Sequence, residues 1–151
     1  MRASSRTLRA KWRLWHLLRA AISIEDLVER VAAWRGRPIQ LLAFAFPQGE
    51  LSGMWLALNG LDVVVFPQEA SPLRRVAIIG HELGHMLLGH SPGDAGAALS
   101  QAVPELDVAR YLGRTMYTEQ AEAEAERLGT QIVKALAIVD AGRGSISERL
   151  R

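Results

Sequence analysis

Hydrophobic residues recur at helical spacing in two stretches near the start of the chain. Residues 7–21 alternate apolar positions with arginines and lysines, which predicts an amphipathic helix or arm, and packing on the domain is favoured over a membrane-surface role. The apolar positions are Leu8, Trp12, Trp15 and Leu18. Ser23 is then a plausible N-cap of a second helix, with Asp26 three residues later, and Gly36 and Pro38 end it. Its expected buried stripe is Leu27, Val31 and Trp34.

Three short apolar runs follow, and they predict strands. They cover residues 39–46, 54–58 and 61–66, and the third run is rich in valine. Asn59-Gly60 separates the second run from the third, and this dipeptide is a strong hairpin signal between two strands. We therefore expect a small and mostly antiparallel sheet in this part of the chain.

The second half of the chain predicts two further helices. Pro72 suits the first helical position, and the apolar pattern after it continues to about Gly89. Residues 91–104 are rich in Ser, Pro, Gly and Asp and indicate a loop. A long helix is expected over residues 118–139.

The order of these elements predicts an α+β fold. A small, mostly antiparallel three-stranded sheet is expected to pack with helix 72–89, with the N-terminal helices and with the long C-terminal helix. Residues 1–22 form a basic amphipathic helix or arm, residues 23–140 the domain, and residues 141–151 a flexible tail.

Composition narrows the function classes. The 151 residues are 49% hydrophobic and 23% charged, which fits one globular domain with a real core. The chain has no cysteine, which excludes disulfides and cysteine-ligated zinc and fits a cytoplasmic location. Six of the basic residues lie within the first twenty positions, but the net charge is only +2, so direct nucleic-acid binding by the domain is not expected. No apolar run is long enough to span a membrane.

The sequence His81-Glu82-Leu83-Gly84-His85 carries the candidate chemistry. Four helical residues correspond to about 400° of rotation, so His81 and His85 lie on one face and can bind one Zn²⁺. Glu82 borders the same face and is placed to take a proton from an attacking water, which makes it the candidate catalytic base. The alternative is an ordinary pair of helical histidines with Glu82 in solvent.

The neighbours of this motif favour the metal site. The preceding turns are apolar, so the helix is expected to be buried, and two buried histidines need a partner. Gly80 and Gly84 each lower helix stability by roughly 1 kcal/mol relative to alanine, which is explained if another element approaches closely there.

A zinc peptidase site needs a third protein ligand. His90 is nine residues from His81, about 900° round a continuous helix, so it faces away and suits the helix C-terminus instead. The acidic start of the last helix offers Glu122 and Glu124, which both border its buried stripe. Helical geometry alone does not choose between these two glutamates.

At these residues the sequence resembles the ImmA/IrrE family of zinc metallopeptidases. The resemblance rests on residues 81–90 and on a second motif in which Glu122 is followed by Ala125, with Glu126 at the family's Asn/Asp position. It departs from the family in having Glu126 for Asn/Asp and Leu128 for an aromatic residue, and it covers roughly residues 39–135.

The resemblance implies a minimal zincin-like fold and one Zn²⁺ per chain. It implies Glu122 as the third metal ligand beside His81 and His85, and Glu126 as the carboxylate that orients a ligating histidine. Glu124 remains the alternative third ligand that helical geometry leaves open. It also implies hydrolysis of a peptide bond in a protein substrate, a helix-turn-helix transcriptional repressor. For the oxyanion, the segment between the motifs offers three candidate donors, namely Tyr111, Arg114 and Tyr117.

Two functions from other classes remain as alternatives. The chain is then either a catalytically silent regulator of the same fold or a toxin-like protein that acts through its basic N-terminal helix. The presence of Glu82 argues against the first alternative, because a scaffold that only binds metal does not need it.

Overall fold

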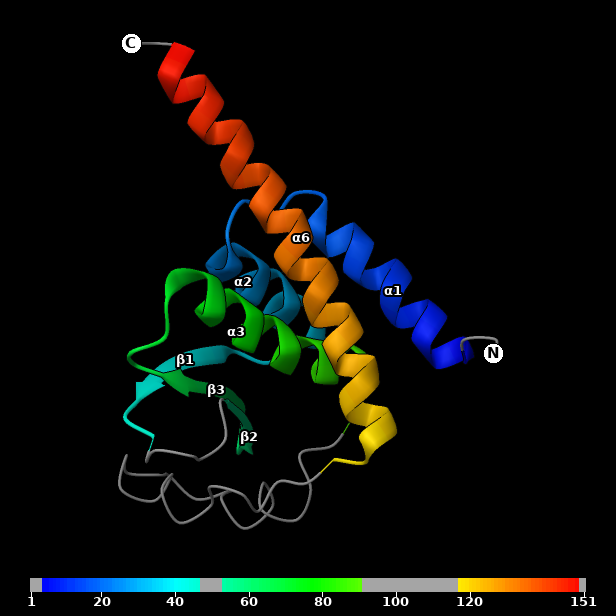
Figure 1. Cartoon of the computed structure of the whole chain (residues 1–151). Helices are drawn as coiled ribbons and strands as arrows, with labels where there is room; N and C mark the ends of the chain where they lie inside the picture. The colour runs from blue at the N-terminus through cyan, green and yellow to red at the C-terminus, as the bar shows by residue number, and fades with distance from the viewer. Residues whose placement is uncertain (1–3, 47–52, 91–116, 150–151) are drawn as a thin grey trace.

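The computed structural model describes residues 4–46, 53–90 and 117–149, and it describes side chains up to residue 137. In this part of the chain it contains four helices and one three-stranded sheet. Figure 1 shows the helices gathered against one side of the sheet, with the long last helix crossing beside the others. The α+β class predicted from the sequence is confirmed.

The helices begin and end close to the expected positions. Their bounds are Ser5–Leu18 for α1, Ile24–Arg35 for α2, Pro72–Leu87 for α3 and Glu119–Arg149 for α6. Ser23 caps α2 by accepting a hydrogen bond from the backbone N–H of Asp26, and Gly36 ends that helix with φ +71°. The last helix continues ten residues beyond the expected end at residue 139, so it includes most of the stretch 141–151 that was predicted to be a flexible tail. None of the helices described is long and apolar enough to cross a membrane.

The sheet is mixed, so the prediction of a mostly antiparallel sheet was wrong. Its strands are β1 (Ile39–Phe44), β2 (Met54–Leu58) and β3 (Leu61–Pro67), in the order β1-β3-β2. β2 and β3 form the predicted hairpin around Asn59-Gly60, whereas β1 pairs with β3 in parallel. A hairpin signal determines only the two strands that it joins, and it does not say on which side or in which direction a third strand adds.

The hairpin places β3 in the centre of the sheet, with apolar side chains on both faces. Val64 and Phe66 face the helices together with Trp55, and they belong to the main hydrophobic core. Val63 and Val65 belong to a second apolar cluster together with residues of β2. The strand that supports α3 is therefore buried on both faces, which fits its valine-rich sequence.

Helix α1 packs on the domain, but not through the large apolar side chains that predicted it. Its buried residues are Thr7, Ala10 and Leu14, while Leu8, Trp12 and Trp15 are 56–64% exposed. Trp34, expected in the buried stripe of α2, is likewise 39% exposed, and the Arg13 guanidinium lies over its ring. The helix is buried through Thr7, Ala10 and Leu14, and the exposed Trp15 ring instead carries the guanidinium group of Arg19 over its face.

Two substitutions on α1 test this orientation of the helix. Leu14→Ala is expected to lower the free energy of unfolding by about 2 kcal/mol or more, because Leu14 is fully buried. Trp12→Ala, the matched control on the outer face, should change it by less than about 0.5 kcal/mol. Chemical denaturation measures both values, and the reverse order of effects would show that α1 packs through its tryptophans.

Candidate metal centre

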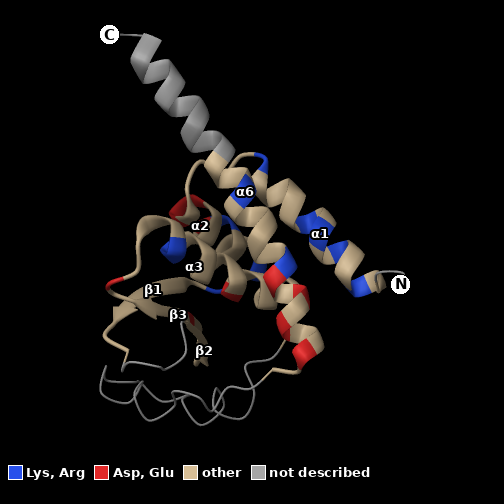
Figure 2. Cartoon of the chain, viewed as in Figure 1, with Lys and Arg blue, Asp and Glu red and all other residues tan. Residues whose placement is uncertain are grey.

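The two motif histidines lie on the buried side of α3, one turn apart. Ser71 caps this helix and Pro72 occupies its first turn, so its register is set well before the motif. His85 is fully buried, and His81 is half-buried at the edge of the contact with α6. The helix therefore presents both imidazoles toward the first turns of α6, which carry a cluster of acidic side chains (Figure 2).

Helices α3 and α6 touch through glycine, as the sequence predicted for Gly80 and Gly84. A Cβ atom added at Gly84 would lie 2.8 Å from the carbonyl oxygen of Ala125 on α6. Gly129 on α6 completes the contact, because a Cβ there would lie 3.1 Å from the backbone nitrogen of His81. Gly129 stands at the small-residue position of the second family motif, but sequence analysis did not predict its contact with α3. The close approach of the two backbones brings the glutamates of α6 within reach of the histidines.

Three ligand atoms converge at this contact. His81 Nε2 lies 2.8 Å from Glu122 Oε2 and 3.2 Å from His85 Nε2, and His85 Nε2 lies 3.6 Å from Glu122 Oε2. A tetrahedral zinc shell with bonds of about 2.0–2.1 Å has ligand–ligand edges of roughly 3.3 Å. The triangle fits that shell, so His81, His85 and Glu122 form a group that can hold a metal ion.

The predicted supporting carboxylate lies behind one of these histidines. Glu126 Oε2 is 3.2 Å from Nδ1 of His81, on the side of the ring away from the other ligand atoms. A His81 that bound metal through Nε2 would carry its proton on Nδ1 and donate it to Glu126. This contact fixes the orientation of the His81 ring.

Glu82 is buried beside the triangle and is poised to remain protonated. Its side chain is 6% exposed, and burial raises its pKa to about 8, with the Glu122 carboxylate adding to the rise. Glu82 also lines a groove between α3 and α6 of about 630 Å³, together with His81 and Glu122. The carboxyl group of Glu82 thus lines the same groove as two of the candidate metal ligands.

Burial and neighbouring histidines keep His85 neutral. Burial lowers its pKa to about 3, and His81 and His90 contribute in the same direction. The ring of Tyr117 stacks on His85 with a centroid distance of 3.7 Å and an angle of 14°. A neutral imidazole with an accessible lone pair is the form that binds metal.

Tyr117, one of the three candidate oxyanion donors, lies at the site. Its hydroxyl is buried and has no hydrogen-bond partner among the described residues. Burial raises its pKa, and Glu82 and Glu122 add to the rise, so the group stays protonated as a donor. The other two candidates, Tyr111 and Arg114, lie outside the described residues.

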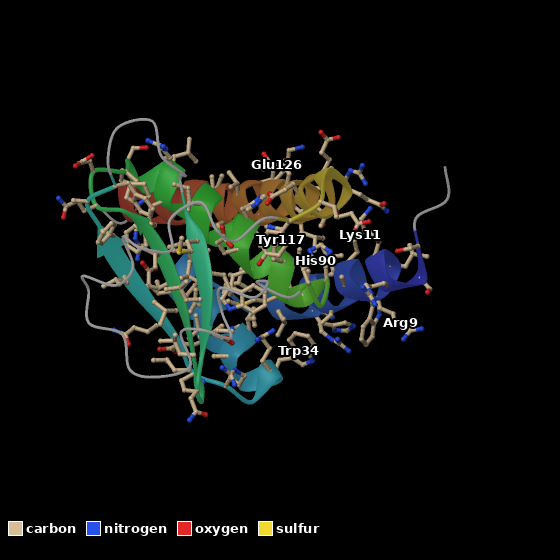
Figure 3. All side chains as sticks on the ribbon, turned by 90° about the horizontal axis from the view of Figure 1, so that it is seen from below. Arg9, Lys11, Trp34, His90, Tyr117 and Glu126 are labelled. Atoms are coloured by element: carbon tan, nitrogen blue, oxygen red, sulfur yellow. The ribbon has the colours of Figure 1, made fainter. Side chains whose placement is uncertain are left out.

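A continuous helix would turn His90 away from the motif, but in the structure His90 lies against it. The helix ends at Leu87, and the turn that follows places His90 Nδ1 2.9 Å from Nδ1 of His85. Figure 3 shows His90 next to Tyr117, whose ring stacks on His85. Its Nε2 lies 3.4 Å from Glu124 Oε2. Glu124, the alternative third ligand, therefore contacts His90, and Glu122 is the glutamate that lies against both candidate ligands. Gly89 was the sequence signal for this turn, because glycine commonly ends a helix, and the prediction for His90 did not take it into account.

The comparisons with known proteins found no relative of this chain. No protein-family model, no curated protein and no solved structure matches the chain. The functional argument therefore depends on the residues and their geometry.

Proposed function

We propose that this protein is a zinc-dependent endopeptidase whose metal ligands are His81, His85 and Glu122. The observation that carries the proposal is the convergence of three ligand atoms with a buried carboxyl group one residue after the first histidine. Two histidines and a carboxylate are a known ligand set of catalytic zinc, and they leave a coordination position open. The same donors also accept Mn²⁺ or Fe²⁺.

The chain's own groups supply the remaining parts of a hydrolytic site. A bound zinc ion supplies Lewis acidity that activates water and polarises the scissile carbonyl. A cation bound beside Glu82 would favour its ionised form, and the carboxylate would then accept the proton of the attacking water and return it to the leaving amine. The Tyr117 hydroxyl, which is protonated and unpartnered among the described residues, donates a hydrogen bond to the developing oxyanion. Glu126 holds the His81 ring in its ligating orientation.

The edge of the sheet offers a place for an extended substrate. β2 pairs with β3 on one side, and no described strand pairs with its other edge. A Cβ added at Gly53, directly before β2, would lie 3.6 Å from Oε1 of Glu82, so this edge begins beside the candidate base. A peptide that adds to β2 would therefore pass the site. In keeping with the family resemblance, we propose a helix-turn-helix repressor as the substrate.

Metal content measured by elemental mass spectrometry tests the metal site. We expect about one zinc per chain in the wild type and in Glu82→Gln, and loss of zinc in His85→Ala and Glu122→Ala, which each remove one of three ligands. Glu124→Ala tests the alternative third ligand, because this glutamate lies on the same helix but outside the ligand triangle, and the variant should still hold about one zinc per chain when zinc is in excess. A wild type without stoichiometric metal after zinc reconstitution would rule out the proposal.

Proteolysis of a helix-turn-helix repressor, the substrate class that the family resemblance implies, tests the reaction. The wild type loaded with zinc is expected to cleave it, and the Glu82→Gln protein, which keeps the metal, is expected to be slower by about 10²–10⁴-fold. Equal cleavage by the two proteins would show that Glu82 is not the base, and metal binding without cleavage of any repressor would favour the silent regulator.

A further inference from the structure

The turn that ends α3 returns the chain onto the second motif histidine. The backbone N–H of His90 donates to the carbonyl of His85, and that of Gly89 donates to the carbonyl of Met86. Gly89 has φ +73°, the left-handed conformation that glycine adopts readily. These two bonds define a Schellman turn, in which the residue after the glycine lies over the third residue from the helix end. Here those two residues are His90 and His85.

The side chains of these two residues continue the contact. In a Schellman turn the pair is commonly apolar, but here two imidazoles meet through their Nδ1 atoms at 2.9 Å. Glu124 lies beyond His90, with its Oε2 3.4 Å from His90 Nε2. The three side chains are only 1%, 11% and 15% exposed, for His85, His90 and Glu124 respectively. They form a shielded row that leads from the ligand triangle to α6.

The direction of the hydrogen bonds in this row follows from metal binding. If His85 offers Nε2 to the metal, its proton lies on Nδ1 and is donated to Nδ1 of His90. His90 then carries its own proton on Nε2, which faces the Glu124 carboxylate. His90 cannot itself complete the ligand triangle, because its contact is with the Nδ1 side of His85, away from His81.

We propose that His90, held by Glu124, is a positioning residue that fixes the ring orientation and tautomer of His85 for metal binding. The inference rests on the proposed metal site. It gives the two histidines different supports, because His81 meets a carboxylate directly and His85 reaches one through a second imidazole. It also assigns Glu124 to the support of a ligand.

Zinc affinity, measured by competition with a chromogenic chelator, tests the role of His90. His90→Ala is expected to weaken zinc binding by about 10–100-fold, the usual effect of removing an outer partner of a ligand. His90→Asn should stay within about threefold of the wild type, because the asparagine side-chain oxygen can occupy nearly the position of Nδ1 and accept the proton of His85. Thermal unfolding of the metal-free proteins verifies that each variant folds.

Two further measurements separate positioning from general packing or charge. The Co²⁺-substituted protein should show an altered ligand-field spectrum in His90→Ala and a nearly normal one in His90→Asn. Glu124→Gln should weaken zinc binding less than His90→Ala and should have no added effect in the His90→Ala background. Glu119→Gln, which removes an exposed charge from the same end of α6, is the control and should leave the affinity unchanged.

The outcomes distinguish this inference from the proposal on which it rests. A wild type that binds no zinc would overturn both. If the wild type binds zinc and the His90→Ala protein binds it equally tightly, only the role of His90 would be overturned. Equal weakening in His90→Ala and His90→Asn would show that packing is lost, and equal effects of Glu119→Gln and Glu124→Gln would reduce the role of Glu124 to net charge.

Discussion

Glu82→Gln is expected to stabilise the metal-free protein at pH 7 by on the order of 3 kcal/mol, although it removes the candidate base. The Glu82 side chain is almost fully buried, and burial with the neighbouring Glu122 raises its pKa to about 8. Folding at neutral pH must therefore hold a proton on this carboxyl group or bury its charge. Glutamine has nearly the same shape and requires neither.

The gain should depend on pH in a defined window. Below the ordinary glutamate pKa of 4.5 the carboxyl group is protonated in both the folded and the unfolded chain, so it contributes no pH dependence. Between pH 4.5 and about 8 only the unfolded chain releases the proton, and the stability of the wild type therefore falls as pH rises relative to that of Glu82→Gln. Above that window the difference levels off.

Chemical denaturation in the presence of a chelator, at several pH values between 4 and 9, measures this difference. Glu119→Gln is a suitable control, since its exposed carboxyl group should give a small change at every pH. A constant difference between Glu82→Gln and the wild type across the window would show that Glu82 ionises normally in the folded protein. It would also remove the argument that this group is tuned for proton transfer.

Gly84→Ala is expected to lower stability by roughly 1–3 kcal/mol and zinc affinity by about tenfold or more, even though alanine is the better helix former. The added methyl group would lie 2.8 Å from the carbonyl oxygen of Ala125, and a backbone atom cannot rotate away. Helix α6 would have to move outward. Glu122 lies one turn before Ala125 on the same helix, so its carboxylate would leave the ligand triangle.

Gly80→Ala is the matched control for this effect. Its added methyl group would lie 3.3 Å from Cγ2 of Ile132, a side-chain atom that can shift slightly. We expect a change in stability within about 1 kcal/mol, because the gain in helix propensity offsets the tighter contact. Thermal unfolding and chelator competition measure both variants, and equal behaviour of Gly80→Ala and Gly84→Ala would contradict the close contact at Gly84.

Local signals in the sequence predicted the elements that position the site. Serine caps, Pro72 and the Asn59-Gly60 hairpin act over a few residues, so their effects are visible without knowledge of the fold. The glycines of the motif also indicated a close neighbour, and α6 lies there. The family resemblance favoured Glu122 over Glu124, which helical geometry alone did not separate.

The features that sequence analysis missed depend on contacts between distant segments or on one backbone angle. The parallel pairing of β1 with β3 is not encoded in either strand. Buried Asp62, which accepts hydrogen bonds from Arg35 and from the Trp55 indole, is a polar residue in an apolar run whose partners lie elsewhere in the chain. The position of His90 followed from the left-handed Gly89, which a continuous helical wheel ignores.

The ligand triangle also joins two parts of the chain that are remote in sequence. His81 and Glu122 are 41 residues apart and belong to different helices. A metal ion bound to both is a reversible cross-link, and a cross-link that closes a long loop limits the freedom of the unfolded chain. If the proposed site binds zinc, removal of the metal would release this cross-link between α3 and α6 as well as stop the proposed hydrolysis. The lifetime of the protein among cellular proteases would follow the local supply of zinc.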